Sequence, residues 1–439
     1  MFSDRIALFP ETTQVNDRNQ LVLGGINALD LAAECGTPLY VFDEATLRNQ
    51  CSSFLREFHS RYPSVAVSYA SKAFLSPPLA RLLAEEGMGL DVVSGGEIAV
   101  AKSAGFPSER VYFHGNNKSP EELKLALEWG LGWIVVDSFH EIELLNSIAA
   151  EGGVRQDILL RISPGVDPHT PTHHTATGIL DSKFGFAVAN GQAAESVEKA
   201  QWAENLNLVG LHMHLGSPIY EMGPFCQGIE VGIEFAAEMR DRHGLELQEF
   251  SPGGGFAVQY TVDTPAPSVA DYAEAMTSSL KQSCDKRGFT LPKLVIEPGR
   301  AIVGRAGVAL YTVGAIKEIP GVRKYVSVDG GMGDNIRPAI YGSRYEALVA
   351  GTVDSDRSET VTIAGKYCES GDVLIKDHAL PPVVSGDVIA IPASGAYCIP
   401  MSSNYNAEPK PAIVLVGNGK ATLWRRRQTF EDMMNEEVA

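Results

Sequence analysis

The stretch Val65-Ala66-Val67-Ser68-Tyr69-Ala70-Ser71-Lys72 is a short apolar run that ends in a lysine. Seven further runs follow before residue 300, and most are short and rich in β-branched residues, as buried parallel strands are. They cover residues 90–93, 110–113, 133–136, 158–162, 208–214, 247–250 and 294–296. Since helical patterns separate the runs, the sequence predicts an α/β fold, a (β/α)8 TIM barrel.

Helical patterns occupy residues 77–86, 119–129, 138–151 and 191–204. The clearest helix start is Ser119-Pro120-Glu121-Glu122, with a capping serine, a proline at the first helical position and a glutamate three residues on. In such barrels the chemistry lies at the C-terminal ends of the strands. Those ends carry, in order, Lys72, Ser94, His114, Asp137, Arg161, His214, Gly253 and Glu297.

Length and composition favour a compact enzyme of two domains. The chain has 439 residues, with 36 basic and 54 acidic side chains and a formal charge of −18, which argues against nucleic acid or an anionic membrane as partner. No uncharged apolar run is long enough to span a bilayer, and the N-terminus lacks the apolar core of a signal peptide. Six cysteines without any Cys-x-x-Cys pair predict a reduced, cytoplasmic protein.

After Arg300 the sequence becomes strand-like at residues 309–313, 324–328, 360–364, 388–391 and 412–416, with glycine, proline and aspartate between the strands. The first forty residues also have the pattern of strands and turns, and we expect them to pack with the C-terminal β region. We therefore predict a barrel domain at 43–304. Residues 1–42 and 305–439 would form a second domain, a β-sandwich or β-barrel.

Three strand ends of the barrel suggest a cofactor. An amine at the inner end of a buried strand is partly desolvated, which would make Lys72 a nucleophile toward an aldehyde. An equal alternative is that the lysine side chain extends from the barrel rim into solvent. Gly253, Gly254 and Gly255 could approach a phosphate with their backbone N–H groups, or simply form a tight turn. Glu297 and Arg300 could serve a ring nitrogen and a phosphate, or form a salt bridge. Together these features describe a pyridoxal 5'-phosphate site.

A metal site is the alternative use of the histidines. His212 and His214 stand two apart in a strand and so share a face, and His169, His173 and His174 could join them as ligands. Strand-end carboxylates are few, however, and a metal leaves the strand-end lysine without a role, so we predict no metal. In the cofactor interpretation, one imidazole stacks on the pyridine ring.

The second domain carries further candidate residues. Residues 328–341 leave a strand through glycines and end in Arg337 and Tyr341, and the two parallel donors of an arginine match a substrate carboxylate. Cys368 and Glu369 place a thiol beside a carboxylate, although a lone cysteine is more often inert. Tyr397 offers a phenol for a phosphate.

In this order the motifs resemble those of the fold-type III pyridoxal-phosphate decarboxylases, with an alanine-racemase-like barrel, and among them the diaminopimelate decarboxylases. The resemblance runs from about residue 38 to 411. It rests on Tyr69-Ala70-Ser71-Lys72-Ala73, Asp91-Val92-Val93-Ser94-Gly95-Gly96-Glu97, Gly115-Asn116-Asn117-Lys118, Ser182-Lys183-Phe184-Gly185, His212-Met213-His214-Leu215-Gly216-Ser217, Gly253-Gly254-Gly255, Glu297-Pro298-Gly299-Arg300, Cys368-Glu369-Ser370 and Gly395-Ala396-Tyr397.

The resemblance implies a role for each matching position. Lys72 would hold pyridoxal 5'-phosphate covalently, Glu297 would keep its pyridine nitrogen protonated, and His214 would stack on its ring. The phosphate would be bound or flanked by Ser217, Gly253, Gly254, Gly255, Arg300 and Tyr397.

For the substrate, the resemblance implies decarboxylation of meso-2,6-diaminopimelate to L-lysine, the last step of lysine biosynthesis. Arg337 and Tyr341 would hold the distal carboxylate, with Arg300 and Tyr397 also near the substrate. Cys368 would protonate the carbon that carbon dioxide leaves, and Glu369 would bind the distal ammonium. In this family the cysteine and glutamate serve the neighbouring subunit, so a homodimer with shared active sites is implied.

Two positions depart from the family pattern, and other functions stay open. Many relatives have asparagine where this chain has Phe74 and glutamine where it has Pro218, which affects pocket details alone. The alternative within the same chemistry is a decarboxylase of ornithine, arginine, lysine or a siderophore precursor. Finding Arg337 and Glu369 in one chain favours a substrate whose far end carries both charges. A second class of function is a non-enzymatic cofactor-binding barrel, but such a protein would lack the β domain. A third class is a metal-dependent hydrolase.

Overall fold

The computed structural model describes residues 4–167, 178 and 181–438. The chain folds as two compact units. We call the first the β unit (Met1–Gln50, Val258–Ala266 and Arg300–Ala439) and the second the barrel unit (Cys51–Ala257 and Pro267–Gly299). The boundaries at 42/43 and 304/305 stay predictions.

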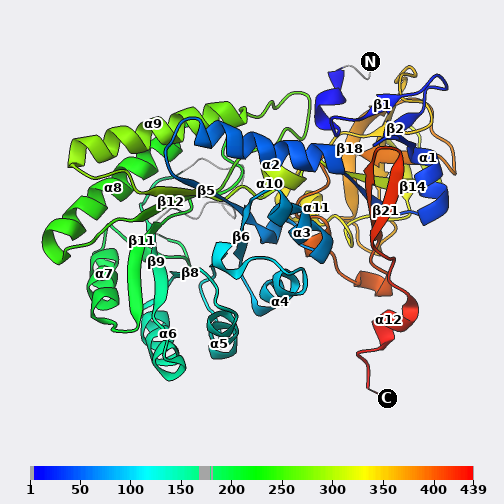
Figure 1. Ribbon diagram of the computed structural model, residues 1–439. Coiled ribbons are helices and arrows are strands. Elements are labelled where there is room, and N and C mark those ends of the chain that lie inside the picture. Colours follow the sequence, from blue (N-terminus) through cyan, green and yellow to red (C-terminus); the bar gives the residue numbers. More distant parts are fainter. Residues whose placement is uncertain (1–3, 168–177, 179–180, 439) are drawn as a thin grey trace. The chain divides into compact units, whose positions relative to one another are not determined.

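Eight parallel strands form the barrel unit in the order β5-β6-β7-β8-β9-β11-β12-β13, and pairing of β13 with β5 closes it (Figure 1). Each of the eight apolar runs overlaps one of them, so the predicted (β/α)8 barrel is confirmed. The strands are β5 (Val65–Ala70), β6 (Gly89–Val92), β7 (Val111–Phe113), β8 (Trp133–Val136), β9 (Gln156–Ser163), β11 (Leu206–His212), β12 (Glu249–Gly253) and β13 (Lys293–Ile296), and the short β10 (Phe186–Ala187) pairs with β9.

Helices follow the strands, and neighbouring helices pack side by side from α3 to α9 (Figure 1). The capping box predicted at Ser119 is present: its hydroxyl accepts from the Glu122 N–H, and the Glu122 carboxylate accepts from the Ser119 N–H. The helices are α3 (Pro77–Glu85), α4 (Gly95–Ser103), α5 (Pro120–Trp129), α6 (Phe139–Gly152), α7 (Gln192–Trp202), α8 (Gly223–His243) and α9 (Val269–Arg287).

Alternation along the strands divides the barrel interior into two layers. The lower layer is apolar and contains Tyr112, Val135, Leu159, Val209 and Val295. Because side chains two residues apart share a face, the next inward positions of four of these strands are His114, Asp137, Arg161 and Glu297. The C-terminal mouth of the barrel is therefore polar above an apolar floor.

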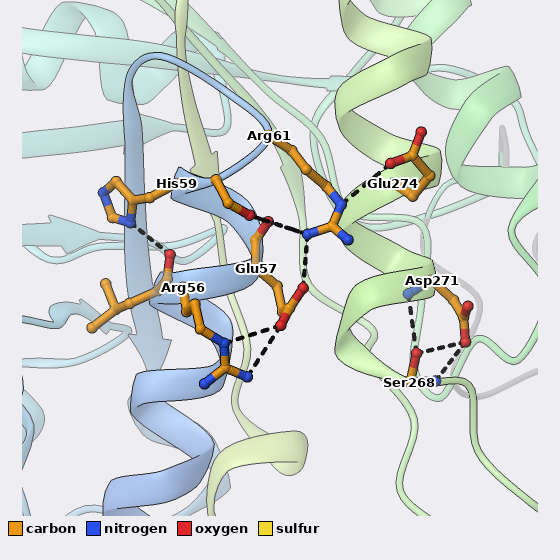
Figure 2. A network of polar contacts seen from close by, with 9 residues as sticks. Arg56, Glu57, His59, Arg61, Ser268, Asp271 and Glu274 are labelled. Atoms are coloured by element: carbon orange, nitrogen blue, oxygen red, sulfur yellow. Dashed lines mark hydrogen bonds and ion pairs between the residues drawn. The ribbon is translucent and has the colours of Figure 1, made fainter.

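The chain enters β5 through a charged cluster at the end of α2 (Glu44–His59), shown in Figure 2. The Arg61 guanidinium donates to the Glu57 carboxylate at 2.7 Å and to the Glu274 carboxylate of α9 at 3.2 Å. Ser268 and Asp271 form the capping box that begins α9. These partly exposed contacts contribute little energy each, but they link the segment before β5 to α9.

The β unit is built around a mixed sheet in the order β18-β17-β15-β14-β4-β20-β21, with β19 pairing with β14 and β16. The N-terminal strand β4 (Leu39–Asp43) lies between β14 and β20, which confirms that the N-terminal segment belongs to this sheet. The other strands are β14 (Gly307–Ile319), β15 (Arg323–Val328), β16 (Leu348–Val349), β17 (Glu359–Ala364), β18 (Val373–Leu380), β19 (Val388–Ile391), β20 (Ala412–Gly417) and β21 (Lys420–Arg425).

Short elements complete the β unit. A small sheet of β1 (Gln14–Val15), β2 (Leu21–Leu23) and β3 (Ile26–Asn27) precedes α1 (Ala28–Cys35). The remaining helices are α10 (Arg300–Val303), α11 (Arg337–Tyr341) and α12 (Phe430–Met434). The apolar core of this unit joins side chains of α1, β2, β4, β14 and β20.

Among the described residues, no helix has both the length and the apolar character that a membrane crossing requires. All six cysteines carry free thiols. Three of them, at 51, 284 and 398, are buried.

A buried ion pair supports the mouth of the barrel between β7 and β8. The Lys118 ammonium donates to the Glu141 carboxylate at 2.7 Å and to the backbone carbonyls of Gly115 and Val135, both at 2.8 Å. Glu141 in turn accepts from the Asp137 N–H at 3.0 Å. The pair is therefore fully hydrogen-bonded, the condition under which buried charges are tolerated.

We predict that Lys118→Met destabilises the protein by about 3–5 kcal/mol, because it leaves the Glu141 carboxylate buried without its cation. Chemical denaturation monitored by circular dichroism measures the change. The matched control is Lys124→Met, since Lys124 forms an exposed pair with Glu151 at 3.7 Å. Equal, small effects of the two substitutions would contradict the structural role of the buried pair.

Candidate active site

A cavity of roughly 360 Å³ opens at the polar mouth of the barrel, within the size range of small-molecule sites. It brings together Lys72, His214 and Glu297, which the sequence placed at three separate strand ends. The other lining residues are Ala70, Ser71, Asp91, Val93, His114, Gly115, Asn116, Arg161, Phe184 and His212.

Glu297 is held as an anion at the end of β13. Its carboxylate is 2.9 Å from His212 Nε2 and accepts a 2.7 Å hydrogen bond from the Ser251 hydroxyl. Burial by itself would raise the pKa of Glu297, but His212, His114 and Ser251 outweigh burial and hold the pKa below its usual range. A buried carboxylate in this state can keep a proton on a facing ring nitrogen.

A second carboxyl group, Asp91 of β6, has the opposite character. Burial and the nearby negative charge of Glu297 raise its pKa well above the usual value, and the Ser68 hydroxyl donates to it. His114 Nε2 lies 3.6 Å from Asp91 and 4.0 Å from Glu297. The ligand atoms of His114, His212 and Glu297 lie within 4.8 Å of one another, so this trio is the geometric alternative for a metal.

His214 follows β11 and presents a neutral ring to the cavity. Burial, with Lys72 and Arg161 nearby, lowers the pKa of His214 well below its usual value. Its Nδ1 accepts a hydrogen bond from the Gly254 N–H at 3.3 Å, which orients the ring. A neutral, flat imidazole fixed in this way suits stacking on a ligand ring. The metal alternative also invoked His169, His173 and His174, which lie outside the described residues.

The glycine loop after β12 requires glycine for close packing. A Cβ atom at Gly254 would lie 2.2 Å from the Glu297 carbonyl oxygen, and one at Gly253 would lie 2.4 Å from the Met213 carbonyl oxygen. Ile219 N–H donates to the Gly255 carbonyl at 2.9 Å, so the segment after Ser217 lies beside this loop. The loop therefore joins the ends of β11, β12 and β13 through the backbone.

Lys72 lies in a short 3-10 turn, Ser71–Ala73, directly after β5. The β5 end is fixed by a 3.1 Å hydrogen bond from the Ala70 N–H to the Pro298 carbonyl. The Lys72 side chain lines the cavity but is exposed, so the desolvation that we expected inside the strand does not apply to it. The position beyond the last strand residue explains the difference.

Sequence reasoning listed Arg161 and Asp137 as strand ends without giving them a role. Arg161 is buried, its guanidinium lies 3.7 Å from the Asp137 carboxylate, and it stacks on the Phe184 ring at 4.3 Å. Asp137 also accepts from the Gly185 N–H at 2.6 Å. Ser94, another strand end, is instead the N-cap of α4. The two cases differ in one respect that the sequence shows. Arg161 and Asp137 each stand two residues after an inward-facing residue of the apolar layer, and Ser94 does not.

In the β unit, Arg300 and Tyr397 form a stacked pair. The Arg300 guanidinium lies 4.6 Å above the Tyr397 ring and donates to the Tyr260 hydroxyl at 2.8 Å. The loop carrying Tyr397 contacts α10 closely, because a Cβ atom at Gly395 would lie 1.8 Å from the Val303 carbonyl oxygen. The two predicted phosphate residues are thus brought together.

Arg337 begins α11 and is buried. Its guanidinium donates to the hydroxyl of Tyr345 and stacks on the Tyr260 ring at 4.7 Å. The predicted partner, Tyr341, ends the same helix and is half-buried, and its role in binding a carboxylate stays a prediction. Tyr260 and Tyr345 were missed because nothing in their loop sequences marks them.

Cys368 and Glu369 lie on an exposed loop between β17 and β18. The loop is ordered by its backbone: Cys368 N–H donates to Asn406 at 2.8 Å, and the Tyr405 hydroxyl donates to the Cys368 carbonyl at 3.3 Å. Asp372 ties it to the loop before α11 by accepting from the Met332 N–H at 2.6 Å and the Tyr367 N–H at 2.9 Å. Both side chains therefore face outward from a well-defined turn.

The barrel residues fit pyridoxal phosphate. The cavity offers an exposed amine, an anionic carboxylate and a neutral stacking ring. Among the described residues, three further polar atoms of the lining, Ser71 Oγ, His114 Nε2 and His212 Nδ1, are buried without a hydrogen-bond partner. Buried polar atoms of this kind mark a place where a polar ligand completes the hydrogen bonding.

Glu97 allows a test of the electrostatics beside the cavity. Burial raises its pKa from 4.5 to about 7, despite a hydrogen bond from the Val93 N–H and the charge of Lys72. The native state thus binds a proton between pH 4.5 and 7 that the unfolded chain has lost, so stability falls as pH rises through this window.

We predict that Glu97→Gln removes this fall in stability with rising pH, because a neutral amide does not titrate. Its stability relative to the parent protein should rise by about 1–3 kcal/mol between pH 4.5 and pH 8. Denaturant unfolding at both pH values measures the difference, with the exposed Glu128→Gln as the matched side-chain control. A difference that stays constant with pH would refute the assignment.

Comparison with known proteins agrees with this site. Residues 45–304 match the family model "Pyridoxal-dependent decarboxylase, pyridoxal binding domain". A diaminopimelate decarboxylase of Bacillus subtilis is 48% identical over 97% of this chain and 97% of its own length. The crystal structure of a diaminopimelate decarboxylase from M. jannaschii in complex with L-lysine has a TM-score of 0.91 and 35% identity, covering 98% of both chains.

A second solved structure, the diaminopimelate decarboxylase of Helicobacter pylori complexed with L-lysine, has a TM-score of 0.84 and 29% identity, and covers 92% of this chain and 98% of its own. The lysine/ornithine decarboxylase of Vibrio vulnificus, at 21% identity and a TM-score of 0.76, shows the shared fold alone. The chain therefore belongs to the fold-type III pyridoxal-phosphate-dependent decarboxylase family, and within it resembles the diaminopimelate decarboxylases.

Proposed function

We propose that this chain is a carboxy-lyase that decarboxylates meso-2,6-diaminopimelate to L-lysine and carbon dioxide, the last step of lysine biosynthesis. The observation that carries the proposal is the buried Arg337, a cation framed by tyrosines on the β unit, in a chain 48% identical to a diaminopimelate decarboxylase. The domains are proposed as 43–304 and 1–42 with 305–439. A cytoplasmic location is supported by the six free cysteines.

The barrel residues hold the cofactor and control its charge. Pyridoxal phosphate, when bound, accepts the electron pair that remains after the bond to the carboxylate breaks. Lys72 supplies the amine for covalent attachment, Glu297 keeps a proton on the ring nitrogen, and His214 packs against the ring face. The anionic state of Glu297 and the neutral state of His214 support the roles proposed for these two residues.

The family resemblance supports the following phosphate and substrate contacts. Ser217 and the backbone of Gly253, Gly254 and Gly255 would bind the phosphate with Arg300 and Tyr397. Arg337 and Tyr341, with Arg300 and Tyr397 nearby, would bind the distal carboxylate. Glu369 would bind the distal ammonium, and the Cys368 thiol would protonate the substrate carbon after carbon dioxide leaves.

The charge at the far end of the substrate distinguishes the leading function from its alternative. A decarboxylase of ornithine, arginine or lysine binds a far end that carries a cation, for which an anionic residue is enough. Arg337 adds a buried cation that such a substrate would meet as a repulsive charge. The β unit thus favours the zwitterionic end of diaminopimelate.

The function is tested by release of carbon dioxide from meso-diaminopimelate, lysine, ornithine and arginine. We expect turnover of diaminopimelate and little of the other three. Arg337→Ala should raise KM for diaminopimelate about a hundredfold or more, because it removes a charge-assisted bidentate contact, while the bound cofactor absorbance is retained.

The control for this substitution is Arg323→Ala, since Arg323 forms a partly exposed pair with Asp377 at 2.9 Å on the same unit. It should leave KM unchanged. Preference of the parent protein for a plain diamine precursor would replace the leading function by its alternative.

We also propose that Cys368 and Glu369 serve the active site of a neighbouring subunit in a homodimer. Cys368→Ala should keep the cofactor but lower kcat by a factor of about 10²–10⁴, because a general acid is removed. Lys72→Ala should lose cofactor and activity. If sites are shared, mixing the two inactive variants under exchange conditions should restore up to about a quarter of the parent activity through mixed dimers. Unchanged kcat in Cys368→Ala would argue against Cys368 as the general acid, and no recovery on mixing would argue against shared sites.

A further inference from the structure

Three tyrosines surround the two buried arginines of the β unit. Arg300 and Arg337 are 8% and 5% exposed. Tyr397 lies under the Arg300 guanidinium, Tyr345 accepts a hydrogen bond from Arg337, and Tyr260 contacts both arginines. We call Tyr260, Tyr345 and Tyr397 the tyrosine frame.

Tyr260 couples the two guanidinium groups. Its hydroxyl accepts from Arg300 at 2.8 Å, while the face of its ring lies 4.7 Å from the Arg337 guanidinium carbon. The rings of Tyr260 and Tyr345 meet edge to face, with centroids 5.4 Å apart and an interplanar angle of 84°. One arginine cannot rotate in this arrangement without disturbing a ring that contacts the other.

Tyr345 further restricts the orientation of the Arg337 guanidinium. Its hydroxyl oxygen accepts from Arg337 Nη1, so its own proton is available for the Cys398 sulfur at 3.7 Å. Cys398 is buried, and burial raises the pKa of its thiol to about 11, so the thiol is neutral at physiological pH. The chain from Arg337 through Tyr345 to Cys398 is therefore directional.

The frame leaves the charge of Arg337 uncompensated. The groups that act on it most strongly are Tyr260, Tyr345 and Cys398, and none of these is a carboxylate. In the described part of the chain, Arg337 has no carboxylate oxygen within 4.0 Å. A protein carboxylate here would occupy both donors of the guanidinium fork and repel an incoming anion, whereas phenols orient the fork and leave its charge available.

We propose that Tyr260 and Tyr345 are positioning residues that set selectivity for a substrate whose far end carries a carboxylate. They hold Arg337 in one orientation without neutralising it. A carboxylate then meets an oriented cation, and a far end that carries a cation meets the same charge as repulsion. The proposal deepens the proposed function and rests on the assignment of Arg337 to the distal carboxylate.

The test uses holoenzyme and two probes, pimelate for a dicarboxylate without amines and cadaverine for a diamine without carboxylates. Tyr345→Phe keeps the ring and removes the acceptor, and should weaken pimelate binding by calorimetry roughly tenfold or more. KM for diaminopimelate should rise by a similar factor, with kcat changed less than threefold and cadaverine binding unchanged. Tyr260→Phe, which keeps the stack on Arg337, should act in the same direction with a smaller effect.

The matched control is Tyr62→Phe, a buried tyrosine of the barrel unit whose hydroxyl donates to the Pro292 carbonyl at 2.8 Å. It should lower the melting temperature without changing binding of either probe. Unchanged pimelate binding in Tyr345→Phe, or equal weakening of both probes, would overturn the proposal. Pimelate binding that depends on Tyr345 in a protein that does not decarboxylate diaminopimelate would uphold this inference and reject the proposed function.

Discussion

The alternation of side chains along a closed ring of eight strands is the constraint on which the catalytic cavity depends. Four of the five strands that place an apolar residue in the lower layer place the residue two positions further on at the mouth, whereas β11, which has a register shift after Leu208, places His212 there. Val295 and Glu297 are such a pair, as are Leu159 and Arg161. A slip of one residue in any strand would exchange the inside for the outside, so the packing of the floor fixes the polar groups of the site.

The pKa values of the side chains at the mouth of the barrel then follow from their closeness to one another and from their burial away from solvent. Two carboxyl groups and three imidazoles share this space, and the pKa values of the two carboxyl groups move apart: the pKa of Glu297 is lowered by the neighbouring histidines and Ser251, while that of Asp91 is raised by burial and by Glu297. Burial lowers the pKa of His212 and of His214. The result is one negative charge beside neutral rings, which is the environment that a protonated pyridine nitrogen requires.

The β unit solves a different problem, which is to keep arginines buried and available. Among the residues that the structure describes, phenols rather than carboxylates contact Arg337, so its desolvated charge is oriented but not neutralised. Close backbone contacts hold the surrounding loops: Gly395 packs on the Val303 carbonyl, and Asp372 joins the Cys368 loop to the segment before α11. Such contacts would help to keep the guanidinium in one orientation, as the proposed carboxylate site requires.

By itself the sequence determined the eight barrel strands, five strands of the second domain, the packing of the N-terminal segment with that domain, and the strand-end residues that meet in the cavity, but not the strands β16, β18 and β21. These are local signals, since apolar alternation and helix caps act over a few residues and barrel closure follows from their order. Only the tertiary structure decided that Lys72 is exposed beyond its strand, that His212 and Ser251 hold Glu297, and that Tyr260 and Tyr345 frame Arg337. The latter contacts join residues from separate loops and strands, and their geometry depends on register and loop conformation, which no pattern within a single segment contains.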